Sequence, residues 1–429
     1  MENWKYWKQN INVMKKKILL MLVFGCGLVS VKGQAMSLDS ILSEIQKSNP
    51  VLRMHDADIR ALNEAAKGAK NWEAPELGTG FWMTPYNTSL WKKNNGSTGM
   101  GQYMITATQM IPNKKELDAN AKYMEAMSSV NEKTKQAVLN ELYAAAKKSY
   151  YDWLIVEKKL KVLDNNEKLL DFMIKSTELR YKNNLGKLDA YYKTKAALGN
   201  IENMRLMMQN EIRQQRIMLN TLMNRNKQED FNIDSFYSIK NYSKQDSGYF
   251  IQARSDIKAI DNNINITYLQ QSLERSKLKP QFGVSYWHMF GFGGFPQQFT
   301  LMATMKLPIA KWSSRSYKAN IESLNWKAES LNQQKQMILN EASGNEERMI
   351  ADIDSKKRQI ALYEKNIIPA LQKNYQTTQL SYEQNTEELF TLFDAWQTLN
   401  MTQLEYLQQL QDLLMMQVEL EKILEIKEP

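Results

Sequence analysis

The amino-acid sequence predicts a mainly α-helical protein that carries four β strands and is built as two structural repeats. The chain has 429 residues but only 9 prolines, and none of them lies between Asn113 and Lys279. Because proline removes a backbone donor and clashes with the preceding turn, a long proline-free stretch favours long helices. Twelve of the 17 glycines lie near the amino terminus or within 78–101 and 283–294, beside segments that alternate like strands. A sequence motif that recurs after about 200 residues is the third observation.

Residues 1–33 are predicted to be a signal peptide. The basic run Lys15–Lys17 precedes the apolar run Ile18–Gly25, and small residues follow before Gln34. This order is typical of a secretory signal, and the apolar run is shorter than the roughly 20 residues that a membrane-spanning helix needs.

Two alternatives remain open at the amino terminus. Met14 is a possible true start, in which case residues 1–13 are an upstream extension. Cys26, preceded by Val23–Gly25, is a candidate site of lipid attachment, although Phe24 is bulky for a lipoprotein cleavage site.

Charge and composition exclude several classes of function. The formal net charge is +9, but residues 1–33 hold six basic residues and one acid, so the remaining chain carries about +4. That is a weak basis for nucleic-acid binding, and we expect no nucleic-acid partner. A single cysteine, Cys26, and two histidines, His55 and His288, exclude a disulfide framework and a thiolate or histidine-rich metal site. We therefore expect no metal site, no cofactor and no enzyme.

The repeat is visible in matching motifs. Ala107–Pro112 is matched by Ala303–Pro308, and Arg180-Tyr181 is matched by Ser381-Tyr382. In each half a shorter helix, over about 37–72 and about 250–278, leads to a β hairpin and then to a long helical hairpin. The predicted units are a first repeat over 34–225, a connector over 226–249 and a second repeat over 250–429.

Four segments alternate with the period of two that a strand requires. Phe299, Leu301 and Ala303 point to one side, whereas Thr300 and Thr304 point to the other. Segments of this length cross a bilayer when tilted, but four strands do not close a barrel, and a lipid-exposed open sheet is not viable. The strands must therefore pair with other copies of the chain or lie outside a membrane. The predicted strands are 76–84, 101–111, 281–290 and 298–307.

The predicted helices are too long for a globular core. If continuous, the helix over Asn113–Tyr181 would be about 100 Å long. Leu392, Trp396 and Leu399 begin a coiled-coil-like seam near the carboxyl terminus. Such helices suit a tube or stalk. A periplasmic coiled-coil structural protein is the alternative from another class, but it explains neither the signal peptide nor the strands.

Taken in order, these features resemble the TolC-type outer-membrane efflux channels from Ser37 to Leu424. The motifs that carry this resemblance are Ser37–Leu42 with Asn49-Pro50, Arg180–Gly186 with Leu188-Asp189, and Tyr382–Thr386 with Phe393–Ala395. A narrower resemblance exists to the channels that serve heavy-metal pumps of the resistance-nodulation-division type. It rests on Ala74–Gly78, Gln109–Pro112 with Lys114-Lys115, Leu222–Arg225, and Leu307–Ile309 with Trp312.

The resemblance implies a homotrimer in the outer membrane of a Gram-negative bacterium. Three copies would form a twelve-stranded β-barrel in contact with outer-membrane lipid, and their helices would form a tunnel through the periplasm. The implied partners are a periplasmic adaptor, also called a membrane fusion protein, and an inner-membrane resistance-nodulation-division transporter. The duct would be passive, and its substrates would include metal ions such as copper and silver or cobalt, zinc and cadmium. A multidrug or type I secretion duct of the same fold is the alternative.

The resemblance also implies a periplasmic gate at the tips of the helical hairpins. Asp394 matches the second acidic position of the family's constriction, and Thr391 replaces the first. Glu387 and Glu388 lie closer to the tip and would supply charge to an acidic ring, unless they only form a solvated helix start. Several tip positions lack the family's glycines, but asparagine tolerates a left-handed turn. The expected adaptor contacts are Asn183, Asn184, Leu185, Gly186, Gln384, Asn385 and Thr386.

Overall fold

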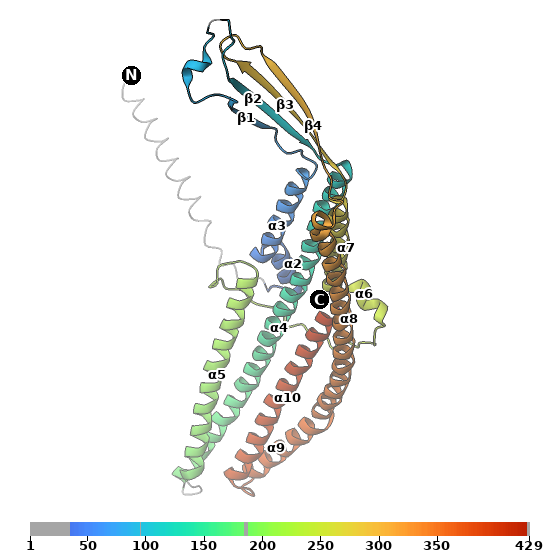
Figure 1. Ribbon diagram of the computed structural model, residues 1–429. Helices are drawn as coiled ribbons and strands as arrows, with labels where there is room; N and C mark the ends of the chain where they lie inside the picture. The colour runs from blue at the N-terminus through green and yellow to red at the C-terminus, as the bar shows by residue number, and fades with distance from the viewer. Residues whose placement is uncertain (1–34, 95, 184–187, 427–429) are drawn as a thin grey trace, which may run out of the picture.

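The computed structural model describes residues 35–94, 96–183 and 188–426 of the chain. The predicted signal peptide, with Cys26, lies outside the described residues, as do Asn184, Leu185 and Gly186 of the first tip. The chain is elongated: a sheet lies at one end, packed helices fill the middle, and two helical hairpin tips lie together at the other end (Figure 1).

Helices and strands follow one another in the same order in both halves of the chain. The first half contains α2 (Leu38–Ser48), α3 (Pro50–Lys67), β1 (Glu76–Trp82), the short 3-10 turn η1 (Thr88–Trp91), β2 (Gln102–Ile111), α4 (Lys114–Lys182) and α5 (Leu188–Leu222). The second contains α6 (Ser247–Ala253), α7 (Ser255–Ser276), β3 (Gln281–Gly291), β4 (Gln298–Lys306), α8 (Lys311–Leu362), the π-helical turn η2 (Tyr363–Ile367), α9 (Ile368–Glu383) and α10 (Leu389–Ile423).

The helix expected over 37–72 is in fact two helices that meet at Asn49. Because Pro50 follows, Asn49 is extended, with ψ at 125°, and its side chain accepts a hydrogen bond from the Val51 backbone N–H at 2.9 Å. The amide group of Asn49 also donates to the Leu222 carbonyl at 2.8 Å, which fixes this corner to the end of α5.

The helix expected over 250–278 is likewise divided, at Arg254. The backbone N–H and the hydroxyl of Ser255 both bond to the Glu425 carboxylate, each at 2.7 Å. These bonds anchor the start of α7 to the end of α10. The interruption thus depends on a tertiary contact, which the local sequence does not reveal.

The sheet is antiparallel and has the strand order β1-β2-β3-β4. Its register places Leu77, Ala107, Tyr286 and Leu301 side by side on one face. That face is apolar and exposed in the single chain, where Leu301 keeps 67% of its surface. The opposite face is lined mainly by glycines, threonines, serine and methionines. Neither β1 nor β4 has an outer neighbour among the described residues.

Glycines on the second face leave room for the side chains of the neighbouring strands to lie over them. A Cβ on Gly283 would stand 2.7 Å from both the Met110 sulfur and the Thr304 hydroxyl. A Cβ on Gly78 would stand 2.7 Å from the Thr106 hydroxyl. A larger residue at either position would therefore displace these neighbouring side chains.

The two hairpin loops, at the end of the sheet farthest from the helices, contact each other. The Gly99 N–H donates to the Gly293 carbonyl at 2.9 Å, and the Trp91 ring stacks on Phe292 with centroids 5.1 Å apart. A Cβ on Gly99 would lie 2.2 Å from the Trp91 carbonyl oxygen, so only glycine allows this approach.

Helix α4 is the central element of the helical body. It is 69 residues long and packs against α3 and α7 nearer the sheet, and against α5 and α10 nearer the tips. Trp153 and Leu154, each 1% exposed, belong to a core shared with α2, α10 and the connector. A second core, around Leu170 and Trp396, lies between the two hairpins below it.

None of the helices in the described part of the chain is both long enough and apolar enough to cross a membrane.

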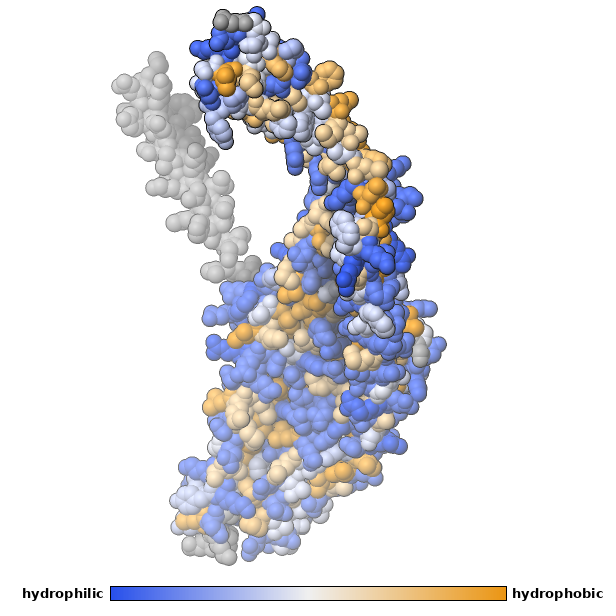
Figure 2. Space-filling view, in the orientation of Figure 1, coloured by the Kyte–Doolittle hydropathy of each residue, from blue (hydrophilic) through white to orange (hydrophobic). Residues whose placement is uncertain are grey.

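The visible face of the helical body is mostly hydrophilic, whereas hydrophobic side chains gather along the sheet and its junction with the helices (Figure 2).

Candidate gate at the helical tips

The second tip is a tight helix ending built around Asn385. Asn385 has a φ of 61°, the left-handed conformation that glycine usually supplies. Its N–H bonds to the Tyr382 carbonyl at 3.1 Å, and the Thr386 N–H bonds to the Ser381 carbonyl at 2.9 Å. This is the Schellman pattern, which satisfies carbonyls at the end of α9. Asparagine therefore fills the conformational role for which the sequence offered no glycine.

Arg180 joins the two tips. Its guanidinium donates to the Tyr382 carbonyl and to the Asn385 side-chain oxygen, both at 2.5 Å. The same group lies 4.0 Å from the centre of the Tyr382 ring, which is 1% exposed. The Tyr382 hydroxyl also lies 3.2 Å from the Ser176 hydroxyl. One cation near the end of α4 thus holds the end of α9 by two hydrogen bonds and a ring contact.

The predicted gate residues lie at the start of α10. Thr391 and Asp394 are exposed and three residues apart, so they share one face of the helix. Glu387 and Glu388 are also exposed, and Glu388 is the N-cap residue of α10, although its side chain makes no capping bond. Among the described residues, Asp394 forms no hydrogen bond or ion pair. An acidic ring requires three copies of the chain, so it stays a prediction.

A cation that the sequence did not reveal lies against the same stretch of α10. The Lys193 ammonium, on α5, stands 3.9 Å from the centre of the Phe390 ring and 4.7 Å from that of Phe393. Phe390 is one turn before Asp394 on α10. Lys193 therefore supplies positive charge to the stretch of helix on which the acidic ring is predicted.

A groove separates α5 from α10 just above the tips. Its volume is about 560 Å³, and Phe393, Trp396 and Asn400 line its α10 side. Trp396 is 3% and Asn400 5% exposed, yet the Trp396 indole N–H and the Asn400 amide oxygen have no hydrogen-bond partner within the described part of the chain. Lys193 and Met204 lie on the α5 side. Packing between the hairpins is thus incomplete here.

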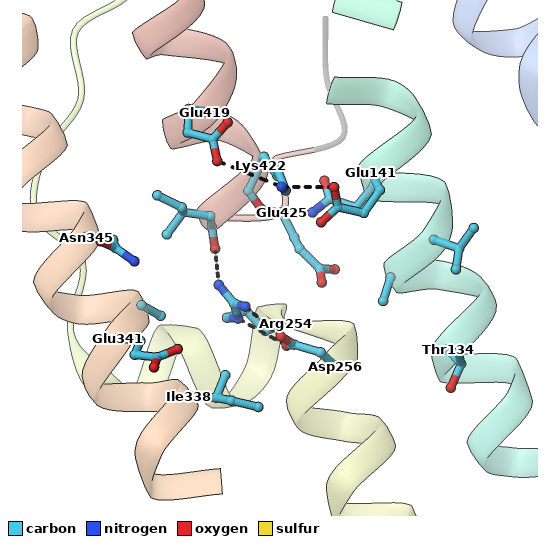
Figure 3. Close-up of a pocket in the computed structure, with 15 residues that line it drawn as sticks. Thr134, Glu141, Arg254, Asp256, Ile338, Glu341, Asn345, Glu419, Lys422 and Glu425 are labelled. Atoms are coloured by element: carbon cyan, nitrogen blue, oxygen red, sulfur yellow. Dashed lines mark hydrogen bonds and ion pairs between the residues drawn. The ribbon is translucent and has the colours of Figure 1, made fainter. Parts of the chain in front are cut away.

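A hollow of about 410 Å³ lies higher, between α4, α7, α8 and α10, and its charges are largely paired (Figure 3). Lys422 stands between Glu141, at 2.9 Å, and Glu419, at 3.8 Å. Burial alone would lower the pKa of Lys422, but the Glu141 carboxylate outweighs it and raises that pKa. Arg254 donates to the Ile423 carbonyl at 3.0 Å and to Asp256. These contacts join the ends of helices and serve a structural role.

The connector is fixed to the helices through a buried carboxylate. Glu421 of α10 is 6% exposed and accepts hydrogen bonds from Lys147 at 2.6 Å, from Lys240 at 3.0 Å and from the Tyr242 hydroxyl at 2.9 Å. Burial would raise the pKa of Glu421, but the two ammonium groups outweigh it and lower that pKa. Lys240 and Tyr242 belong to the connector, so this carboxylate ties three segments together.

Sequence reasoning placed the tips but missed the side chains that join them. Arg180 was predicted as part of the repeat and of the first tip, but without a partner in the second tip, and Lys193 had no predicted role. Gln384, Asn385 and Thr386 form the second tip, whereas of the residues expected at the first tip only Asn183 is described. The position of Arg180, directly before the expected tip, was the sequence signal that could have indicated its role there.

The comparisons with known proteins point to one fold. No protein-family model matches the chain, and no curated protein sequence matches it. Among solved structures, the outer-membrane channel OprN matches with a TM-score of 0.72 and 15% identity over 90% of this chain and 89% of its own. CusC, described by its transmembrane channel formation, matches with a TM-score of 0.72 and 15% identity over 91% and 92%. The open state of the Neisseria gonorrhoeae MtrE outer membrane channel matches with a TM-score of 0.73 and 13% identity over 90% and 88%. At these identities the likeness concerns architecture, and the chain has the fold of these outer-membrane channels along nearly its whole length.

Proposed function

We propose that the protein is the outer-membrane exit duct of a tripartite efflux pump. Three copies would close the sheets into a twelve-stranded barrel in the outer membrane of a Gram-negative bacterium and the helices into a periplasmic tunnel. The observation that carries the proposal is the sheet, which within the described part of the chain has two free edges and one exposed apolar face. In lipid every backbone polar group needs a partner, so such a sheet is viable only when its edges pair with those of other copies.

Large apolar side chains that are exposed on α8 support the assembly of several copies of the chain. Trp312 is 86%, Trp326 68% and Met337 51% exposed, although they lie on a helix that packs against α7 and α10. Removing this apolar surface from water would stabilise an assembly of several copies. Neighbouring copies would cover them in a trimer.

The partners and the substrate follow from the resemblance of the sequence. A periplasmic adaptor would contact the tips around Asn183 and Gln384–Thr386, and an inner-membrane resistance-nodulation-division transporter would supply the energy. We propose metal ions such as copper and silver or cobalt, zinc and cadmium as substrates, because of the heavy-metal motifs. A strain that lacks this gene should then lose metal tolerance, whereas loss of tolerance only to dyes and antibiotics would favour a multidrug duct.

Extraction from membranes tests the class of function. A duct should require detergent for release and should migrate as a trimer that dissociates only on heating. A protein released by salt or alkali as a soluble elongated rod would overturn the proposal and favour the coiled-coil structural protein.

Replacing Asp394 with alanine should weaken the block of conductance by added cations and reduce cation preference in planar bilayers. Three carboxylates around one axis repel each other by about 1 kcal/mol per pair at 4 Å in a water-like dielectric, so bound cations favour the closed ring. We expect a modest effect, because Thr391 replaces the other acid and Lys193 lies nearby. Asp171→Ala, which removes an exposed acid from α4, is the matched control. Identical cation block in Asp394→Ala and wild type would place the gate elsewhere.

A further inference from the structure

A basic groove lies between α4 and α7, where α4 begins and α7 ends beneath the sheet (Figure 1). Its volume is about 450 Å³. Lys115 and Lys122 line it from α4, whereas Arg275 lines it from α7 and Lys279 from the residues that follow α7. All four side chains are exposed. Cations from two segments that are distant in the sequence are therefore gathered in one groove.

Acids of the chain do not neutralise these four cations. Within the described ranges, none of the four side chains forms an ion pair or a hydrogen bond. Asp118 also lines the groove, but its carboxylate lies 3.4 Å from the Lys70 ammonium. Glu274, the residue before Arg275, is paired with Lys277 at 2.5 Å. The groove thus has an excess of positive charge that a bound anion would balance.

Two lysines at the start of α4 oppose the usual preference of a helix. The amino-terminal end of a helix carries partial positive charge, so cations in its first turn are unfavourable. Lys114 and Lys115 nevertheless follow directly after the N-cap residue Asn113. Arg275, by contrast, lies in the last turn of α7, where a cation is favourable. Helix stability therefore explains Arg275 but not Lys115.

The basic groove lies on the same side of the molecule as the apolar face of the sheet. A second groove at this junction is lined by Glu116 of α4 and Leu273 of α7. It is also lined by Met110, Gln281 and Lys306, which belong to the opposite face of the sheet. Because successive residues of a helix are 100° apart, the residues of α4 and α7 that line the two grooves point to different sides. The second groove follows the polar face, and the basic groove follows the apolar one.

The basic groove begins directly below the last apolar row of the sheet. That row consists of Ile111, Phe282 and Met305, which are neighbours in the register. Lys115 is four residues after Ile111, and Lys279 is three residues before Phe282. In a duct whose apolar face contacts lipid, these cations lie at the level of the headgroups of the periplasmic leaflet.

The lysines of α4 are placed to reach this level. The headgroup region is about 5–7 Å thick on each side of a bilayer, and Lys122 lies about 10 Å from Lys115 along the helix. Side chains of a helix lean toward its amino terminus, which for α4 is the end next to the sheet. A long lysine side chain can therefore bring its ammonium group up to the headgroups. Lysine binds phosphate as a point charge, and arginine adds a planar group with several donors.

We propose that the basic groove binds the headgroup phosphate of an anionic phospholipid in the periplasmic leaflet. Lys115, Lys122 and Lys279 surround the phosphate, and Arg275 bounds the groove on α7. The proposal rests on the proposed function, because that function places the apolar face of the sheet in outer-membrane lipid. In a trimer the groove occurs three times, so bound lipids would fix the depth of the duct in the membrane.

Lipid binding to the detergent-solubilised protein tests the proposal. Phosphatidylglycerol and phosphatidylcholine with identical acyl chains are added separately, and the bound lipids are counted by native mass spectrometry. One basic residue near an anionic lipid surface contributes about fivefold in affinity. We therefore expect wild type to bind phosphatidylglycerol at least about tenfold more tightly than phosphatidylcholine, and the triple variant Lys115→Gln, Lys122→Gln, Lys279→Gln to bind both equally. Equal affinities in wild type, or an unchanged preference in the triple variant, would overturn the proposal.

A matched control separates the groove from the overall charge. Lys161→Gln, Lys168→Gln and Lys175→Gln together remove three exposed lysines that lie at seven-residue steps on α4, far from the sheet. This control should keep the full preference for phosphatidylglycerol, and loss of the preference would contradict a site in the groove. Lys122→Gln alone changes one exposed position within the helix and should weaken phosphatidylglycerol binding about fivefold, so the site is tested even if the triple variant does not fold.

Two further outcomes identify the anion and the level at which the proposal fails. Inorganic phosphate at the concentration of the lipid should not displace phosphatidylglycerol, and complete displacement would show a site for free phosphate instead. A wild-type trimer that requires detergent but lacks the lipid preference would overturn the groove and leave the duct intact. Release of the protein as a soluble rod would overturn the duct, whereas the comparison of variants decides on the groove independently.

Discussion

Replacing Arg180 with alanine should open the duct. The guanidinium makes two charge-assisted hydrogen bonds and a cation–π contact that join α4 to the second tip. Loss of such a group costs about 2 kcal/mol or more, which changes the ratio of two states by roughly 30-fold in each protomer. We expect a large rise in single-channel conductance or open probability in planar bilayers, with trimers assembled as in wild type.

Two variants define the chemistry of the Arg180 contact. Lys182→Ala removes a neighbouring exposed cation whose partner among the described residues is Glu178 of its own helix, at 3.0 Å, and should leave conductance unchanged. Arg180→Lys keeps the charge but loses the planar guanidinium group, which bonds to both acceptors through Nη2 and lies against the Tyr382 ring, and should be intermediate. An Arg180→Ala protein with the conductance and open probability of wild type would show that other contacts hold the tips shut.

Replacing Glu421 with alanine should destabilise the helical body by about 3–5 kcal/mol, the usual cost of removing one partner of a buried ion pair. The change removes the carboxylate between the Lys147 and Lys240 ammonium groups and the acceptor of the Tyr242 hydroxyl. Urea-induced loss of helical circular dichroism in detergent measures it. Glu347→Ala is the matched control, because its pair with Lys244 is largely exposed and should contribute at most about 1 kcal/mol.

The contribution of Glu421 should also depend on pH. The pKa of Glu421 is lower in the folded protein than its ordinary value of 4.5. The unfolded chain therefore takes up the proton first as the pH falls. The stabilisation is complete above pH 4.5 and is lost as the pH drops through the folded pKa. The stability difference between wild type and Glu421→Ala should shrink in that range, and a difference that is constant down to pH 3 would contradict this assignment.

The mainly helical architecture with a small sheet could be predicted from the sequence because its signals are local. Absence of proline predicted the continuous α4, and alternation predicted that Phe299 and Leu301 share a face of the sheet. Interruptions of helices were harder to predict. The break at Arg254 depends on Glu425, which is distant in the sequence.

The candidate gate was only partly predictable for a related physical reason. A resemblance of sequence marks positions such as Asp394, but the contact of Arg180 with Tyr382 joins residues 202 apart. Such contacts leave no periodicity in either segment. The acidic ring depends on symmetry between copies and remains a prediction.

The two free edges of the sheet have a consequence for biogenesis. For the proposed trimer, a single copy whose β1 and β4 have no outer neighbour among the described residues is both an unfinished barrel and a template for aggregation. The last edge of the proposed barrel closes only when the third copy joins. The yield of folded protein should therefore depend on the concentration of newly exported chains. The pool of unassembled subunits in the periplasm would have to be kept small or escorted by a chaperone, and a cell could adjust the number of ducts steeply through modest changes in export.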